Sequence, residues 1–133
     1  MQILNPPTVA PPIQGLYAQL TIVDTGRIAF LAGQVALDRS GDLVGPGDHR
    51  LQAAQCFRNI KAALVALGVG PQAIAKMTIY VVDHKPERIE EIFGAGADVF
   101  GDAWPVTAST YLGVGSLGFP EWLVEIDAVI ALG

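Results

Sequence analysis

Two carboxylates lie close together on the last apolar run of the chain, residues 123–130. Strand side chains alternate between two faces, so Glu125 and Asp127 point to one face and the apolar residues around them point to the other. A carboxylate that accepts a proton from water is what general base catalysis of a hydrolysis needs. A strand with one solvated face explains the same acids without any chemistry, and it is the commoner origin of this pattern.

The other residues that could do chemistry form no recognisable catalytic or metal-binding set. His49 and His84 are expected at a helix start and in a turn, both exposed, and no Cys, His or carboxylate cluster has zinc-ligand spacing. Cys56 is the only cysteine and is interpreted as a small buried or half-buried hydrophobe on a helix. We therefore expect no metal site and no Cys–His or Ser–His nucleophile pair.

The segment Gly113–Gly118 matches the dinucleotide-binding pattern GxGxxG. That chemistry needs a strand before the loop and a helix after it, because the helix N-terminus holds the pyrophosphate. Here Phe119, Pro120 and a predicted strand follow instead. The glycines are therefore interpreted as a turn or a close backbone approach, and not as a nucleotide site.

Charge and cysteine content narrow the classes of function. The net charge is −5, and the 8 Lys and Arg residues are scattered, whereas binding to phosphate backbones needs a basic surface. We therefore expect no nucleic-acid partner. The single cysteine excludes an internal disulfide and fits a reducing compartment. With no visible signal peptide or membrane-spanning run, the expected location is the cytoplasm and no membrane contact is expected.

The composition also suggests a partner subunit. Hydrophobic residues make up 51% of the 133 residues and charged residues 16%, compared with about a quarter charged in typical domains. No charged residue occurs from Ala103 through Pro120. A small domain has little interior for such a segment, so we expect a second copy of the chain to cover one of its faces.

Apolar periodicity predicts the elements that must position the candidate residues. Strands are predicted at residues 18–23, 27–32, 75–82, 106–114 and 123–131, with a short one at 34–37, and Asp24–Gly26 predicts a hairpin turn between the first two. Helices are predicted from about Arg50 to Leu67 and from Pro86 onward. This order indicates an α+β fold in which both helices cover one face of a sheet.

Several segments, taken in order, resemble the RidA family, also called the YjgF or endoribonuclease L-PSP family. They span nearly the whole chain: residues 15–19, 32–34, 38–41, 52–64, 76–83 and 124–128. Each motif is weak by itself, and the ordered set carries the resemblance. It implies a chorismate-mutase-like α+β fold, a mixed β-sheet with two helices on one face, as a single domain over residues 1–133. It also implies a homotrimer with small-molecule clefts between subunits.

The resemblance implies a set of site residues. Characterised members hydrolyse reactive 2-imino acids to 2-keto acids and ammonia without a cofactor, and their catalytic glutamate falls on Glu125 and their cleft tyrosine on Tyr17. Two positions depart from the family pattern. Ala32 replaces a serine, and either Ser109 or Thr107 replaces the arginine that binds the substrate carboxylate, depending on the alignment.

The lost arginine has no obvious substitute, because no Lys or Arg follows Arg88, and nothing in the sequence brings Arg27 or Arg50 to the cleft. The first hypothesis is therefore an enamine/imine deaminase with altered substrate choice, in which Glu125 is the general base. The alternative is a non-catalytic small-ligand-binding or regulatory trimer that uses the same intersubunit cleft. Ribonuclease activity, which the family label suggests, is disfavoured by the acidic balance.

Overall fold

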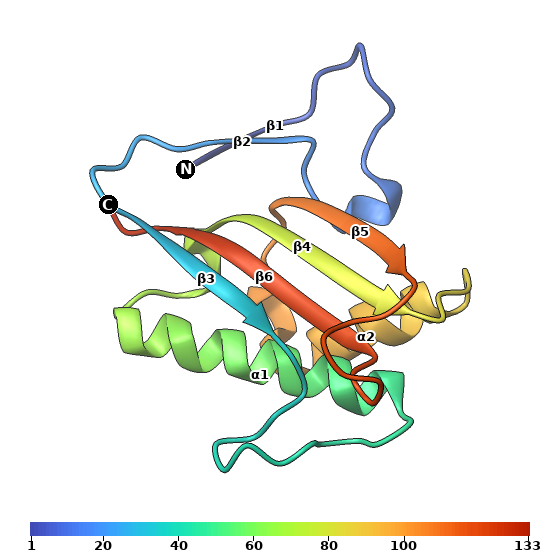
Figure 1. Ribbon diagram of the computed structural model, residues 1–133. Coiled ribbons are helices and arrows are strands. Elements are labelled where there is room, and N and C mark those ends of the chain that lie inside the picture. The colour runs from blue at the N-terminus through green and yellow to red at the C-terminus, as the bar shows by residue number, and fades with distance from the viewer.

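The computed structural model describes residues 1–133 and contains a four-stranded sheet with two helices on one face (Figure 1). The strand order is β3–β6–β4–β5. These strands are β3 (Ile28–Gln34), β4 (Ile74–Val82), β5 (Ala108–Val114) and β6 (Val124–Ala131). β4 and β5 run parallel, whereas β6 is antiparallel to both of its neighbours. The predicted α+β fold with a mixed sheet is confirmed.

The two helices are α1 (His49–Leu67) and α2 (Arg88–Phe100). The Asp48 carboxylate caps α1 by accepting a hydrogen bond from the Leu51 amide at 2.9 Å. Gly68 ends the helix in the left-handed conformation, with φ 72°. Neither helix is long and apolar enough to cross a membrane.

The hydrophobic core lies between the helices and the sheet. On β4 and β6, fully buried residues alternate with half-buried ones, as expected for strands with only one covered face. The buried side chains from both layers include Phe57, Ile60, Leu64, Met77, Ile79, Val81, Ile92, Val124, Ile126 and Ile130.

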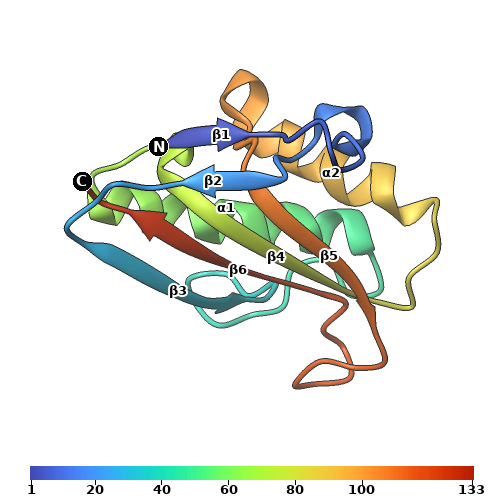
Figure 2. The same ribbon diagram turned by 90° about the horizontal axis from the view of Figure 1, so that it is seen from above.

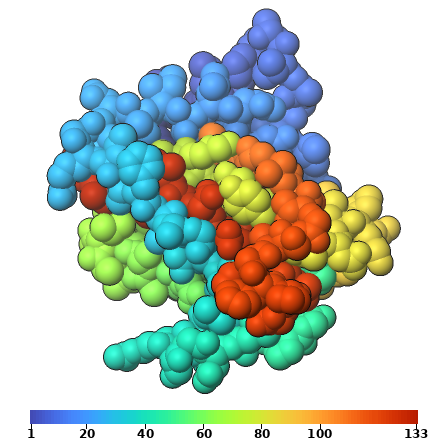
Figure 3. All heavy atoms as spheres, viewed as in Figure 1, coloured from blue at the N-terminus to red at the C-terminus, as the bar shows by residue number.

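The other face of the sheet, which we call the open face, carries the side chains that point away from the helices. In Figure 2, which looks down on this face, α1 runs behind the strands. In the space-filling view, β6 reaches the surface between β3 and β4 (Figure 3). Glu125 and Asp127 share this face, as the strand alternation predicts.

The predicted hairpin between residues 18–23 and 27–32 is wrong. The strand β2 (Leu20–Ile22) is short and pairs with β1 (Gln2–Leu4) in a separate two-stranded sheet, while β3 pairs with β6. The Thr21 hydroxyl donates to the Ala75 carbonyl, which fixes β2 near the start of β4. The predicted short strand at 34–37 is reduced to the end of β3 and one isolated bridge at Leu37.

Candidate functional site

Glu125 holds an unpaired carboxylate on the open face. Glu125 is half-buried on β6 and lies in register with Tyr80 of β4. Its carboxylate forms no hydrogen bond or ion pair with the rest of the chain. Its neighbour Asp127 accepts a hydrogen bond from the Tyr80 hydroxyl at 3.0 Å, and this bond raises the pKa of that hydroxyl above its ordinary value. Of the two acids singled out by spacing, Asp127 is therefore engaged and Glu125 is free to accept a proton from water.

The space for the Glu125 carboxylate comes from a glycine on the neighbouring strand. The pairing of β3 with β6 shifts between Leu31 and Gln34, so Ala32 and Gly33 lie in a bulge opposite Asp127, with Gly33 next to the Glu125 side chain. A Cβ atom at position 33 would lie 2.7 Å from Glu125 Oε2. Ala32 is exposed and offers no polar side-chain atom at this position.

A second group of candidate residues lines a cavity of about 550 Å³ along β5, at the edge of the sheet. Its walls come from the segment before β2, from β4 and β5, and from the first half of α2. The lining residues are Ile13, Leu16, Tyr17, Gln19, Ile79, His84, Ile89, Phe93, Ser109, Thr110 and Tyr111. The lining is mostly apolar and contains no Lys, Arg, Asp or Glu side chain.

The two alternatives for the arginine position have different surroundings. Ser109 lines the cavity and donates its hydroxyl to the Thr107 carbonyl at 3.1 Å. Thr107 is buried, and its hydroxyl donates to the Ile74 carbonyl at 2.7 Å. Thr107 is absent from the lining of this cavity, so Ser109 is the hydroxyl that a ligand there could contact.

The chain by itself does not bring the candidate residues into one site. Tyr17 and Ser109 line the same cavity, whereas Glu125 and Ala32 lie on or beside the open face. The strand order places β4 between β6, which carries Glu125, and β5, which carries Ser109. Glu125 is absent from the lining of the cavity, so the two groups do not share a pocket within one chain.

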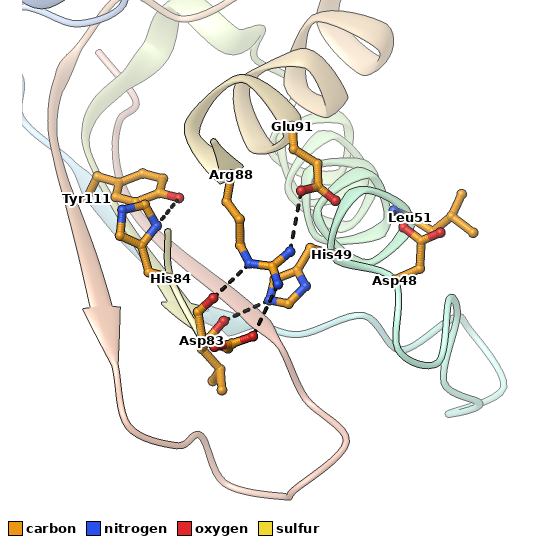
Figure 4. Close-up of polar contacts among 9 residues, drawn as sticks. Asp48, His49, Leu51, Asp83, His84, Arg88, Glu91 and Tyr111 are labelled. Atoms are coloured by element: carbon orange, nitrogen blue, oxygen red, sulfur yellow. Dashed lines mark hydrogen bonds and ion pairs between the residues drawn. The ribbon is translucent and has the colours of Figure 1, made fainter. Parts of the chain in front are cut away.

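Sequence reasoning missed four polar residues of the cavity lining, Gln19, His84, Thr110 and Tyr111. His84 was expected to be exposed, but it is half-buried, and its Nδ1 lies 3.2 Å from the Tyr111 hydroxyl (Figure 4). Burial is the main cause that raises the pKa of Tyr111 to about 12. Tyr111 falls two residues after Ser109 on the same strand face, so strand alternation was the available signal for it. No such signal exists for a histidine in a turn.

His49 was also expected to be exposed, and this prediction is wrong. It is 5% exposed, and its Nε2 lies 2.7 Å from the Val82 carbonyl oxygen. The contact ties the first turn of α1 to the end of β4 (Figure 4). The burial therefore serves the packing of two elements.

The side chains of Arg27 and Arg50 do not line the cavity. Arg50 forms an ion pair with Asp98 at 2.7 Å between α1 and α2. Arg27 precedes β3 and so lies at the opposite end of that strand from Gly33. Neither is among the lining residues of the cavity, so neither supplies a positive charge there.

Cys56 is buried on α1, where its thiol contacts the Val124 carbonyl at 3.5 Å, and burial raises its pKa to about 12. A protonated, buried thiol is a poor nucleophile, in agreement with its interpretation as a small hydrophobe. No group of three or more His, Cys, Asp or Glu side chains converges to a possible metal site.

The fold and the residues around Glu125 can be compared with known proteins. The family model described as endoribonuclease L-PSP matches residues 8–132. The chain belongs to the RidA/YjgF family. A RutC family protein of Pyrococcus horikoshii is 33% identical over 122 residues, which cover 90% of each chain. A Rid-family structure from Yersinia pestis superposes with a TM-score of 0.89 at 32% identity and covers 98% of both chains.

The name of one RidA/YjgF relative, TdcF, bears on the reaction class. The Escherichia coli protein named "putative reactive intermediate deaminase TdcF" is 33% identical over 79 residues, 59% of this chain and 54% of TdcF. The crystal structure of TdcF with bound serine superposes with a TM-score of 0.68 at 26% identity and covers 98% of both chains. Membership of the RidA/YjgF family and the likeness to TdcF support a RidA-like function.

Proposed function

We propose that the protein is an enamine/imine deaminase that hydrolyses reactive 2-imino compounds to a carbonyl product and ammonia. The observation that carries the proposal is the unpaired Glu125 carboxylate on the open face, in the clearance that Gly33 leaves. The RidA/YjgF membership and the likeness to TdcF support the same reaction class.

In the proposed reaction, Glu125 accepts a proton from a water molecule while the water oxygen attacks the carbon of the C=N bond. Glu125 returns this proton to the nitrogen, which gives a carbinolamine. It then passes the hydroxyl proton of the carbinolamine to the nitrogen, the C–N bond breaks, and ammonia leaves as the C=O bond forms. One water is consumed for each imine, and Glu125 is restored. Tyr17 and Ser109 orient the substrate in the cavity.

The proposal includes a homotrimer. Glu125 and the cavity lie on different parts of one chain, so the open face of one copy must meet the β5 edge of the next to complete a site. The uncovered apolar residues of the open face, such as Phe30 at 79% exposed, support an interface there.

A coupled assay tests the reaction. An amino-acid oxidase generates 2-imino acids, semicarbazide traps them, and the protein competes with the trap. Glu125→Gln should abolish this competition, because an amide cannot accept the proton from water. Asp127→Asn, on the same face, is the matched control and should retain activity. Competition that persists in Glu125→Gln would show that the assignment is wrong.

The second candidate is a non-catalytic trimer that binds a small ligand in the same cleft. The apolar lining of the cavity, which contains no Lys or Arg, favours it. In this case an apolar metabolite should raise the melting temperature without product formation, and Ser109→Trp should block that shift by filling the cavity. A shift that is unaffected by Ser109→Trp would exclude this cavity as the binding site.

Ribonuclease activity is not proposed, although the description of the matching family model mentions it. The net charge of −5 and the scattered basic residues do not suit a phosphate backbone. Cleavage of RNA by highly purified protein, lost in Glu125→Gln, would overturn this conclusion.

A further inference from the structure

Two polar side chains of the cavity lining, His84 and Tyr111, have no role in the proposed reaction. Their rings meet edge to face with centroids 5.1 Å apart, and His84 Nδ1 lies 3.2 Å from the Tyr111 hydroxyl (Figure 4). Tyr111 also stacks on Phe93 of α2, at 6.0 Å between centroids. Contacts on both sides of the Tyr111 ring therefore fix the position of its hydroxyl.

The turn that carries His84 is held from several directions. Asp83 has a positive φ of 52°, and Arg88 donates to its carbonyl at 2.7 Å and to its carboxylate at 3.2 Å. A Cβ at position 113 would lie 2.9 Å from the His84 Cβ, so Gly113 allows His84 to pack against β5. The imidazole is thus a positioned group and not a loose turn side chain.

The second ring nitrogen of His84 is available to a ligand. His84 Nε2 has no hydrogen-bond partner in the chain. Every fully buried polar side-chain atom of the chain does have a partner, so Nε2 is not fully buried and solvent reaches it. The Tyr111 hydroxyl is protonated near neutral pH, since burial raises its pKa to about 12. When this hydroxyl donates to Nδ1, the remaining proton of the neutral imidazole lies on Nε2. Protonated imidazole also presents N–H at Nε2.

His84 is the one lining residue that can carry a positive charge. The nearby Arg88 is engaged with Asp83 and Glu91. Lys76 donates to the Thr110 hydroxyl at 2.8 Å from the open face and is not part of the lining. Among the lining residues, His84 is therefore the one that could offer a positive charge to an acidic ligand.

We propose that the His84–Tyr111 pair recognises the carboxylate of the substrate through His84 Nε2, in place of the arginine that is absent from this chain. The apolar remainder of the cavity then selects 2-imino acids with branched or aromatic side chains, which pack against Leu16, Ile89 and Phe93. Tyr111 is a positioning residue that fixes the imidazole proton. This inference rests on the proposed deaminase function and names its substrate class.

Binding to the 133-residue protein tests recognition separately from turnover. The probes are phenylpyruvate, a stable keto-acid product, and its neutral methyl ester, each titrated calorimetrically. His84→Leu should weaken phenylpyruvate binding about 10- to 100-fold, as for loss of a hydrogen bond to a charged group, and should change ester binding little. Tyr111→Phe keeps the ring contacts and should weaken phenylpyruvate binding about three- to tenfold. Lys85→Gln, an exposed neighbour in the same turn, is the matched control and should bind like wild type.

The oxidase-coupled assay with phenylalanine completes the test. His84→Leu should raise KM by the same factor as the dissociation constant and leave kcat within about threefold of the wild-type value. The reason is that the lost contact binds the substrate and the transition state equally well. Equal weakening of acid and ester, unchanged binding in His84→Leu, or no phenylpyruvate binding by wild type would overturn the inference. Selective loss of acid binding in His84→Leu with no turnover by wild type would support the recognition site and refute the deaminase function. Turnover that depends on Glu125 but not on His84 would support the deaminase function and refute the recognition site.

Discussion

The clearance around the Glu125 carboxylate depends on the absence of a side chain at position 33. Gly33 lies in the bulge of β3, and a Cβ there would approach Glu125 Oε2 to 2.7 Å. Such a contact is too short to persist, so the carboxylate would have to move. The position of the proposed base is therefore set by a residue that has no chemistry of its own.

Gly33→Ala should consequently lower turnover by about 10- to 100-fold through displacement of Glu125, with the chain still folded. Gly26→Ala is the control, since a Cβ at position 26 has no atom within 4 Å, and it should leave turnover unchanged. The oxidase-coupled assay measures both variants, and circular dichroism checks their fold. Full activity in Gly33→Ala would show that the carboxylate does not act from this position.

At the scale of elements, the Tyr80–Asp127 hydrogen bond links the two central strands, β4 and β6, across the open face. The bond forms only while the Tyr80 hydroxyl is protonated, and it raises the pKa of that hydroxyl in the folded chain. Its contribution to stability is fully present below the unfolded pKa, about 10, and is lost as pH rises through the raised folded value.

The urea midpoint of the wild type should therefore fall more steeply above about pH 10 than that of Tyr80→Phe. The difference between the two proteins isolates this hydroxyl from the other tyrosines. At neutral pH, Tyr80→Phe should be the less stable protein by about 1 kcal/mol, because Asp127 loses its hydrogen-bond donor. If the urea midpoints of the two proteins changed with pH in parallel over the whole range, the proposed contribution of the Tyr80–Asp127 hydrogen bond would be contradicted.

The central elements were predictable because each has a strong pattern of its own. β4, β6 and α1 were located to within about two residues from alternation and helical spacing. The pairing of β1 with β2 was not predictable, since β1 has three exposed residues and no alternation.

Within the site, alternation placed Thr107 and Ser109 on one face, but only the structure shows that Thr107 is buried against Ile74. His84 was missed because its position depends on Gly113 and Tyr111, distant in sequence.

At the scale of the whole molecule, the open face carries exposed apolar side chains on β3. Phe30 is 79% exposed and Ile28 is 47% exposed. Both lie on the face that the helices leave uncovered, next to the half-buried acids of β6. A single copy of the chain leaves this area in water, which costs free energy in proportion to the apolar surface.

Phe30→Glu should therefore dissociate the proposed homotrimer, because the interface would bury an unpaired charge. Val65→Glu is the matched control, since Val65 is 71% exposed on α1, away from the open face, and the assembly should survive there. Light scattering coupled to size-exclusion chromatography measures the mass of each variant. A monomeric wild type, or a trimeric Phe30→Glu, would contradict the proposed interface.

The separation of Glu125 from the cavity has a genetic consequence. In the proposed assembly, two alleles that are each inactive, one without Glu125 and one with a blocked cavity, would complement each other. Mixed trimers would then contain sites that take an intact base from one allele's product and an intact pocket from the other's. With random mixing, roughly a quarter of the sites would be whole. Two alleles that each lack Glu125 would restore nothing, so the pattern of complementation between mutants would reveal which residues belong to which side of the site.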